Sequence, residues 1–405
     1  MPGRWSEVAR SVGLLQADGV MSPTIFTEMS ALAVATDSAN LGQGFPDEEG
    51  PLWVREIAVQ AILQGSNQYP PLRGIAALRE AVSAHQHTHY GISLNPDTEV
   101  LVTAGATEAL TAAILALTGT GDEVVTLEPF YDSHAAAIAM SGATHKTVPL
   151  IPQEDGFRLD RDALRATVNE KTRVILVNTP HNPTGTVLSH EELTLIAEEA
   201  ERFDAIVITD EVYEHLLYDG ATHVPFATLD GMFDRTLTVS SAGKTFSLTG
   251  WKIGWITGPA LLLERVLAVK QYLTFSGGAP FQPAIARALT DGAEDIATLR
   301  QTLDRRRASL IKWLTDAGFH TVRPEGTYFV CADASPFLSS EITDGADFAR
   351  WLPGAIGVAC VPLSAFCREG SATAELLKNW VRFTFVKDDR TLETARERLL
   401  ALRPS

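Results

Sequence analysis

The chain has 405 residues, of which 45% are hydrophobic and 20% charged, and its formal net charge is −17 at pH 7. This length exceeds one ordinary hydrophobic core and predicts two domains. The negative charge disfavours binding to nucleic acids or anionic membranes, although local positive groups can still bind an anionic substrate.

Cysteine content and the N-terminal segment indicate the cellular compartment. Cys331, Cys360 and Cys367 are too few and too widely spaced for a disulfide framework or a zinc site. We therefore expect a reducing, cytoplasmic environment. Residues 1–20 contain no continuous apolar signal core. No apolar run is long enough to cross a membrane.

Short apolar runs alternate with helical segments through the middle of the chain. Their β-branched residues show little alternation, which is typical of strands buried on both faces of a parallel sheet. We expect seven such strands, at residues 100–104, 123–127, 144–150, 173–178, 205–209, 236–240 and 251–257. The pattern predicts a large α/β domain at residues 46–290, with a mostly parallel seven-stranded sheet covered by helices.

The pattern changes after about residue 290. A charged helix at 298–317 precedes short strands at 327–332, 357–362 and 380–386, and a final helix is expected at 392–402. We predict a smaller α+β domain formed by residues 291–405, joined by residues 1–45.

Ligands of open α/β sheets bind beyond the carboxyl ends of the strands, and unusual polar groups occur at several of these ends. Ala106 and Thr107 follow the first strand after a glycine, where small residues and a helix N-terminus suit an anion. The alternative is an ordinary helix start with Thr107 as N-cap. Tyr131 follows the second strand and either stacks on a flat cofactor or packs in the core.

Two further strands also end in polar residues. Asn182 lies in the loop NTPHNPTG, which presents an amide or forms a simple turn. Asp210 directly follows the apolar run AIVIT, so its carboxylate needs a partner. A protonated pyridine nitrogen is one such partner, while a helix N-cap or an internal salt bridge are the alternatives. Tyr213, three residues later, is placed to bind the phenolic oxygen of the same ring.

The run SSAGKTFSLTGWKIGW at residues 240–255 contains Lys244 among apolar residues and glycines. An uncharged lysine amine forms Schiff bases with aldehydes, and Ser241 and Lys252 suggest an anion beside it. Pyridoxal 5′-phosphate (PLP) carries both an aldehyde and a phosphate. One alternative is a solvated loop lysine. The other is the Ser-x-x-Lys motif of penicillin-recognising enzymes, whose partner motifs are missing here.

Two more features of the sequence concern ligand binding. Arg382 lies between apolar residues in WVRFTF, where it either grips a carboxylate with two hydrogen bonds or faces solvent on an edge strand. His85, His87 and His89 fall on one predicted helix, and His85 and His89 share a face as zinc ligands can. Without a third-ligand motif or an acidic partner, we expect a solvated helix end and no metal.

Taken together, these motifs resemble the class I/II aminotransferases of PLP fold type I. The resemblance covers about residues 40 to 387 and is carried by NLGQGFPD, NQYPP, VTAGATEAL, EPFYDS, NTPHNPTG, ITDEVYEHL, SSAGKTFSLTGWKIGW and VRFTF. It implies transfer of an amino group between an amino acid and a 2-oxo acid, with PLP as cofactor.

The resemblance also implies residue roles. Lys244 is the Schiff-base lysine and proton shuttle, Asp210 the partner of the pyridine nitrogen, and Tyr131 the stacking ring. Tyr213 and Asn182 bind the ring oxygen. The phosphate site comprises Ala106, Thr107, Ser241 and Lys252. The α-carboxylate of the substrate is held by Gly44, Asn182 and Arg382. Tyr69 reaches the phosphate of the partner subunit, which implies a homodimer with shared active sites.

The substrate is constrained by two departures from kynurenine-type enzymes. Those enzymes carry an aromatic residue in place of Thr107 and an aromatic pair in place of Gly277-Gly278. The resemblance therefore favours N-succinyl-LL-diaminopimelate:2-oxoglutarate aminotransferase of lysine biosynthesis, with Arg73 as a candidate for the distal carboxylate. The alternative is that Gly277-Gly278 only forms a tight turn and does not widen the substrate pocket.

Other functions remain open on the sequence. A kynurenine-, glutamine- or methionine-type aminotransferase and a PLP-dependent C–S β-lyase share these motifs. A transcription regulator with an aminotransferase-like domain is disfavoured by the negative charge and by the few residues that precede NLGQGFPD.

Overall fold

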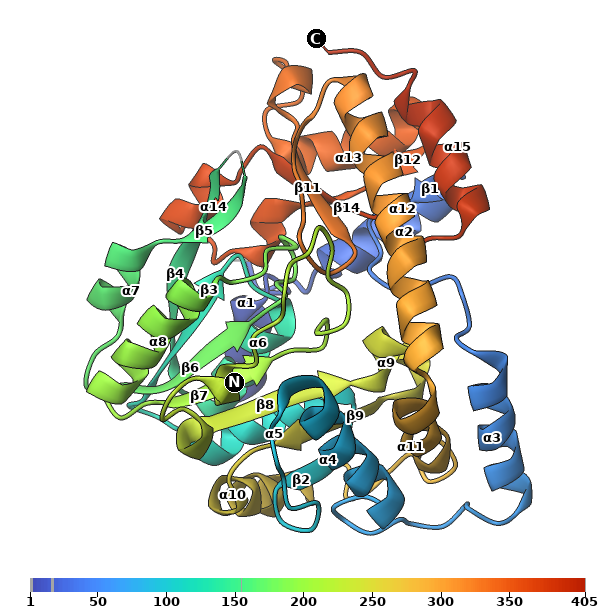
Figure 1. Cartoon of the computed structure of the whole chain (residues 1–405). Helices are drawn as coiled ribbons and strands as arrows, with labels where there is room; N and C mark the ends of the chain where they lie inside the picture. Colours follow the sequence, from blue (N-terminus) through green and yellow to red (C-terminus); the bar gives the residue numbers. More distant parts are fainter. Residues whose placement is uncertain (1–2, 16–17, 154, 405) are drawn as a thin grey trace.

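A large mixed sheet forms the centre of the computed structural model, which describes residues 3–15, 18–153 and 155–404 (Figure 1). The strand order in this sheet is β2-β9-β8-β7-β6-β3-β4-β5. Its strands are β2 (Val100–Ala104), β3 (Glu123–Glu128), β4 (Thr144–Gln153), β5 (Gly156–Leu159), β6 (Thr172–Asn178), β7 (Ile206–Asp210), β8 (Thr236–Ser241) and β9 (Ile253–Thr257).

The sheet matches the predicted fold class, with one strand more than expected. Strands β4, β3, β6, β7 and β8 run parallel, whereas β9 is antiparallel to both β2 and β8. The additional strand, β5, has four residues and forms an antiparallel hairpin with β4. A run this short carries too little pattern to be recognised in the sequence.

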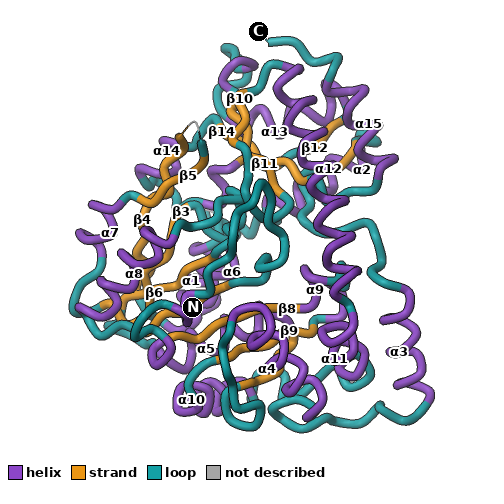
Figure 2. Tube along the Cα trace, viewed as in Figure 1, coloured by secondary structure: helices purple, strands orange, loops and turns teal. Residues whose placement is uncertain are grey.

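Helices cover both faces of the sheet, as Figure 2 shows. The helices are α1 (Arg4–Ser11), α2 (Ile25–Ala35), α3 (Leu52–Leu63), α4 (Ala76–Tyr90), α5 (Gly105–Leu117), α6 (Asp132–Ser141), α7 (Arg161–Thr167), α8 (His190–Arg202), α9 (Ala242–Thr245), α10 (Ala260–Lys270), α11 (Gln282–Asp291), α12 (Ala293–Ala317), α13 (Gly345–Ile356), α14 (Ala372–Leu376) and α15 (Asp389–Leu399). Helix α8 begins at a capping box in which Ser189 and Glu192 satisfy each other's backbone N–H groups.

Burial on both faces explains the continuous apolar runs of the strands. Successive side chains of a strand point to opposite faces. In β6, Val174 and Leu176 join the core cluster formed with α5 and α10, while Ile175 and Val177 join the cluster formed with α8. Each face therefore requires its own set of apolar residues, and alternation disappears from the sequence.

A second, smaller part of the chain lies above the sheet in Figure 1 and carries the long helix α12 beside it. Its antiparallel sheet has the order β10-β11-β14-β13, and a separate parallel pair joins β1 to β12. The strands are β1 (Ala39–Asn40), β10 (His320–Val322), β11 (Phe329–Asp333), β12 (Val358–Ala359), β13 (Val361–Pro362) and β14 (Trp380–Thr384). The strand expected at 357–362 is thus two short strands, and β10 was not expected.

The first residues of the chain contact both parts of the molecule. Helix α1 packs against α6 beside the large sheet, whereas α2 packs against α13 and β1 pairs with β12. The domain limits at residues 46 and 290 stay a prediction. Among the described residues, no helix is both long enough and apolar enough to cross a bilayer.

Candidate active site

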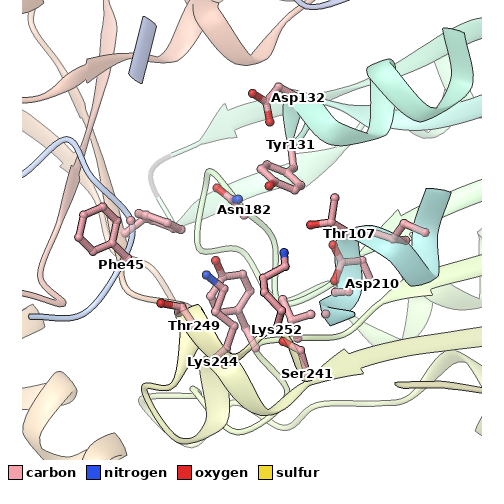
Figure 3. Close-up of a pocket in the computed structure, with 18 of the residues that line it drawn as sticks. Phe45, Thr107, Tyr131, Asp132, Asn182, Asp210, Ser241, Lys244, Thr249 and Lys252 are labelled. Atoms are coloured by element: carbon pink, nitrogen blue, oxygen red, sulfur yellow. The ribbon is translucent and has the colours of Figure 1, made fainter. Parts of the chain in front are cut away.

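A cavity of about 350 Å³ opens at the carboxyl end of the large sheet, and Figure 3 shows residues that line it. It brings together every site residue expected from the sequence except Tyr69. The predicted residues that line it are Gly44, Ala106, Thr107, Tyr131, Asn182, Asp210, Tyr213, Ser241, Lys244, Lys252 and Arg382. Residues separated by more than 300 positions in the sequence, from Gly44 to Arg382, therefore meet in one place.

Lys244 lies in the single turn of α9, which directly follows β8, and its amine points into the cavity in Figure 3. Its Nζ donates a hydrogen bond to Tyr328 Oη at 2.9 Å, and that hydroxyl donates to the Gly44 carbonyl oxygen at 2.7 Å. The alternative of a solvated loop lysine is wrong. Tyr328, which the sequence analysis missed, is buried just before β11, where an aromatic residue indicates only core packing.

Asp210 ends β7 with a buried side chain. Its Oδ2 lies 3.3 Å from Nε2 of His134, while Oδ1 is buried and has no hydrogen-bond partner among the described residues. An unpaired buried carboxylate oxygen is costly, and a protonated pyridine N–H would satisfy it. No helix begins at Asp210, so the helix-cap alternative is wrong, whereas the internal ion pair is present in part. His134 was not predicted.

The start of α5 forms one wall of the cavity. Its N-cap is Ala104, without a side-chain cap, and Thr107 lies inside the first turn, so Thr107 is not the N-cap. The free N–H groups of this turn, together with Ser241 and Lys252, suit a phosphate. Gly105 has a φ of +73°, and a Cβ at this position would lie 3.3 Å from Lys252 Nζ. Glycine there leaves room for the ammonium.

Tyr131 and Tyr213 place aromatic rings in the cavity. Burial raises the pKa of Tyr131 to about 12, and the pKa of Tyr213 also lies well above its ordinary value because this side chain is buried beside Tyr328. Both hydroxyls are therefore protonated near neutral pH and are able to donate hydrogen bonds. The rings of Tyr213 and Tyr328 pack edge to face at 5.2 Å.

Arg382 reaches the cavity from β14, an inner strand between β11 and β13, and is only 2% exposed. Its placement on a solvent-facing edge is therefore excluded. Its Nη1 donates to Asn182 Oδ1 at 2.9 Å and its Nη2 to the Gly42 carbonyl oxygen at 3.1 Å, while the guanidinium stacks 3.9 Å from the Phe329 ring centre. Burial lowers the pKa of Arg382 to about 10, which leaves the group charged at neutral pH. A carboxylate in the cavity is a suitable counter-ion.

Tyr69, predicted to reach the partner's phosphate, and Arg73 and Gly278, considered for the substrate side, lie outside this cavity. Tyr69 is 80% exposed and contacts Phe275, with 5.3 Å between ring centres. Arg73 pairs with Glu264. Gly278 has a φ of +67°, and a Cβ there would collide with the Ile253 side chain, as expected of a tight turn. Among the described residues, the cations that line the cavity are Lys244, Lys252 and Arg382.

The histidines of α4 differ from expectation. His85 is 4% exposed, so the solvated helix end is wrong for this residue. His85 Nε2 lies 2.7 Å from Nε2 of His215, and the neighbouring Glu214 is buried. The third imidazole and the acidic residue come from a distant segment, which spacing along one helix cannot reveal. Burial lowers the pKa of His85 and of His215.

Comparison with protein families adds the deciding observation, because residues 36–399 match the model of aminotransferase class I and II. The chain belongs to this family. It is an aminotransferase, and its cofactor is PLP.

Individual relatives of this aminotransferase agree with the family. A probable N-succinyldiaminopimelate aminotransferase from Mycobacterium tuberculosis is 52% identical over 388 residues, which cover 94% of this chain and 97% of the relative. A methionine aminotransferase from Escherichia coli is 39% identical over 382 residues, which cover 94% of this chain and 96% of the relative. A solved N-succinyldiaminopimelate aminotransferase from M. tuberculosis superposes with a TM-score of 0.91 at 49% identity, covering 99% of both chains.

Proposed function

We propose that this aminotransferase transfers the amino group of N-succinyl-LL-diaminopimelate to 2-oxoglutarate in lysine biosynthesis. The observation that carries the proposal is the 52% identity, over 94% of the chain, to a probable N-succinyldiaminopimelate aminotransferase. The methionine aminotransferase is more distant, at 39% identity. Thr107, in place of a bulky aromatic residue, leaves space beside the start of α5 for a long, polar substrate.

Each residue of the cavity has its own role in the proposed reaction. PLP supplies an aldehyde that captures the substrate amine and a ring that accepts electrons. Lys244 Nζ would remove the α-proton of the substrate and return it to the cofactor carbon on the other side of the amine nitrogen. Asp210 Oδ1 would accept the pyridine N–H, and its negative charge would keep that nitrogen protonated, while His134 contacts Oδ2 and orients the carboxylate.

Other residues of the cavity bind and orient. Tyr213 and Asn182 donate to the ring oxygen, and Tyr131 stacks on the ring. Ala106, Thr107, Ser241 and Lys252 hold the phosphate at the start of α5. Arg382, together with Asn182 and the backbone at Gly44, grips the α-carboxylate of each substrate in turn. The hydrogen bond from Arg382 to Asn182 supports this arrangement, since it fixes both groups side by side.

The proposal includes a homodimer in a reducing cytoplasm. Tyr69, Tyr272 and Phe275 are 80%, 84% and 45% exposed, which is unusual for large aromatic residues in one region. A second subunit placed over them would bring Tyr69 to the neighbouring phosphate site. A partner subunit would also supply the cations that bind the distal carboxylates. In this proposal Lys252, Lys244 and Arg382 already bind the phosphate, the aldehyde and the α-carboxylate. The cysteines Cys331, Cys360 and Cys367 are free, as in a reducing compartment.

The decisive experiment is a half-reaction monitored by the absorbance of the bound cofactor. Purified holoenzyme is mixed separately with N-succinyl-LL-diaminopimelate, kynurenine, methionine and glutamate. The succinylated substrate and glutamate should convert the cofactor fastest, and Lys244→Ala should convert it with none of them. Failure of the succinylated substrate, with rapid conversion by methionine or kynurenine, would assign the enzyme to the alternative group.

A C–S β-lyase is tested by a separate incubation. Holoenzyme is mixed with cystathionine in the absence of any 2-oxo acid, and pyruvate is measured. An aminotransferase should release no more pyruvate than the inactive variant Lys244→Ala does. Steady pyruvate production would identify the lyase reaction.

A further inference from the structure

Three imidazoles from two distant segments meet outside the active-site cavity. His85 and His89 lie one turn apart on the same face of α4, and His215 lies in the segment that follows β7. One ring nitrogen from each of the three lies within 4.8 Å of the others. The ring centres are 4.5 Å apart for His85 and His89, 4.9 Å for His85 and His215, and 5.0 Å for His89 and His215.

Hydrogen bonding alone leaves this cluster poorly satisfied. The pair of Nε2 atoms in His85 and His215, 2.7 Å apart, shares one hydrogen bond. His89 forms no side-chain hydrogen bond with any described residue, and Nδ1 of His85 is buried without one. His85 is buried and His215 half-buried, so the unpaired nitrogen of His85 is uncommon for a buried polar group, whereas the exposed His89 can bond to water.

A buried negative charge lies beside the cluster. Glu214 is 3% exposed, and its Oε1 accepts a hydrogen bond from Ser240 Oγ at 2.5 Å. It forms no ion pair with any lysine or arginine among the described residues. Its neighbours are the hydroxyl of Tyr90 and the imidazoles of His85, His215 and His223, so its charge has no permanently charged partner. A divalent cation held by the imidazoles would compensate its charge.

The spacing of the nitrogens is close to that of a metal site. Zinc–nitrogen bonds of about 2.0–2.1 Å in tetrahedral geometry place ligand nitrogens roughly 3.3 Å apart. To reach this spacing, the Nε2 atoms of His85 and His215 would move apart by about half an ångström. The most distant pair of ring nitrogens would approach by up to about 1.5 Å. Both changes require rotation of the imidazole side chains, and the exposed His89 has the most freedom to rotate.

We propose that His85, His89 and His215 bind a divalent transition metal ion, with Zn²⁺ as the preferred ion. An all-nitrogen set selects zinc, cobalt, nickel or copper over magnesium and calcium. Water would complete the coordination, since the cluster reaches the surface at the exposed His89, and Glu214 would compensate the charge of the ion. The metal ties α4 to the segment that carries Tyr213, so its role is to brace the structure behind the cofactor cavity.

The test uses PLP-loaded enzyme and a chromophoric zinc chelator as competitor. Wild type should bind one Zn²⁺ per chain, and its melting temperature should rise on addition of zinc and remain unchanged with Mg²⁺. His89→Gln should weaken zinc binding by about tenfold or more, because even outer-shell changes at metal sites cost 10- to 100-fold. This side chain is exposed, so the variant should fold as wild type does.

The matched control is His87→Gln. His87 is also exposed on α4, two residues from His89, but lies outside the cluster. This variant should bind zinc as wild type does, and both variants should retain the transamination rate of wild type without zinc. Equal zinc affinity of His89→Gln and wild type, or equal losses in both variants, would overturn the proposal. Absorbance of bound Co²⁺ in the visible range, lost in His89→Gln alone, gives a second readout independent of folding.

Discussion

Asp210 and Tyr328 illustrate how much chemistry depends on single residues. The free oxygen of Asp210 belongs to a residue that lines the cavity, and the hydroxyl of Tyr328 joins two other lining residues, Lys244 and Gly44. Asp210 was predictable because a carboxylate that ends an apolar strand lacks a local partner. Tyr328 was not, since its contact with Lys244 spans 84 positions of the chain.

Asp210→Asn should slow the half-reaction by about 10²-fold or more, the scale for loss of one preorganised electrostatic group. The amide keeps the size of the carboxylate but cannot stabilise a positive charge on the pyridine nitrogen. The measurement is the rate of cofactor conversion with saturating glutamate. Asp132→Asn, which removes another negative charge from the cavity wall, is the control and should retain most of the rate. Equal losses in both variants would remove the special role of Asp210.

Tyr328→Phe should lower kcat/KM by up to about tenfold, because loss of one hydrogen bond costs about 0.5–1.5 kcal/mol and here leaves Lys244 less well oriented. The loss should appear in the rate of cofactor conversion, since the hydroxyl joins Lys244 to the backbone at Gly44. Tyr218→Phe is the control: its hydroxyl donates to the Thr327 carbonyl oxygen at 2.6 Å, away from the cavity. Equal losses in Tyr328→Phe and Tyr218→Phe would reduce Tyr328 to a packing role.

At the scale of elements, the junction of α5 with β9 shapes the phosphate site. Both segments were expected from their apolar patterns, but their close approach was not. A Cβ at Gly254 of β9 would lie 2.6 Å from the carbonyl carbon of Gly105 and 2.8 Å from the Ala106 nitrogen. Backbone atoms cannot rotate away as a side chain can. Glycine at 254 is therefore required for the first turn of α5 to reach its place in the cavity.

Gly254→Ala should weaken PLP binding by about tenfold or more, because overpacking costs about 1–3 kcal/mol and here displaces the turn that faces the phosphate. The cofactor Kd, from titration of apoenzyme by absorbance, measures the effect. Gly250→Ala is the matched control, since no atom lies within 4 Å of an added Cβ there. Unchanged affinity in Gly254→Ala would show that α5 does not depend on this contact.

At the scale of the whole molecule, protonation of buried histidines affects stability. His181 is 1% exposed and burial lowers its pKa to about 3. The ordinary value in an unfolded chain is about 6.5. Between these values the unfolded chain binds a proton that the folded protein excludes. The stability from neutral His181 is therefore complete above pH 6.5 and is lost as the pH falls towards 3.

His181→Gln should destabilise the protein less at pH 5.5 than at pH 7.5, by roughly 1 kcal/mol, because the wild type alone loses the contribution of the neutral imidazole. Urea unfolding at the two pH values measures this difference. The control, His190→Gln at an exposed position on α8, should change the free energy of unfolding equally at both pH values. A destabilisation by His181→Gln that does not change with pH would contradict a depressed pKa.

The sequence by itself determined the order of elements, the α/β class, the cofactor chemistry and the residues at strand ends. Parallel strands share one carboxyl edge, so residues that follow different strands must converge there. Tertiary structure alone decided which side chains complete the site. His134 beside Asp210, Tyr328 beside Lys244 and His215 beside His85 meet across 76, 84 and 130 positions. Such contacts depend on how layers pack, and no local pattern of residues specifies them.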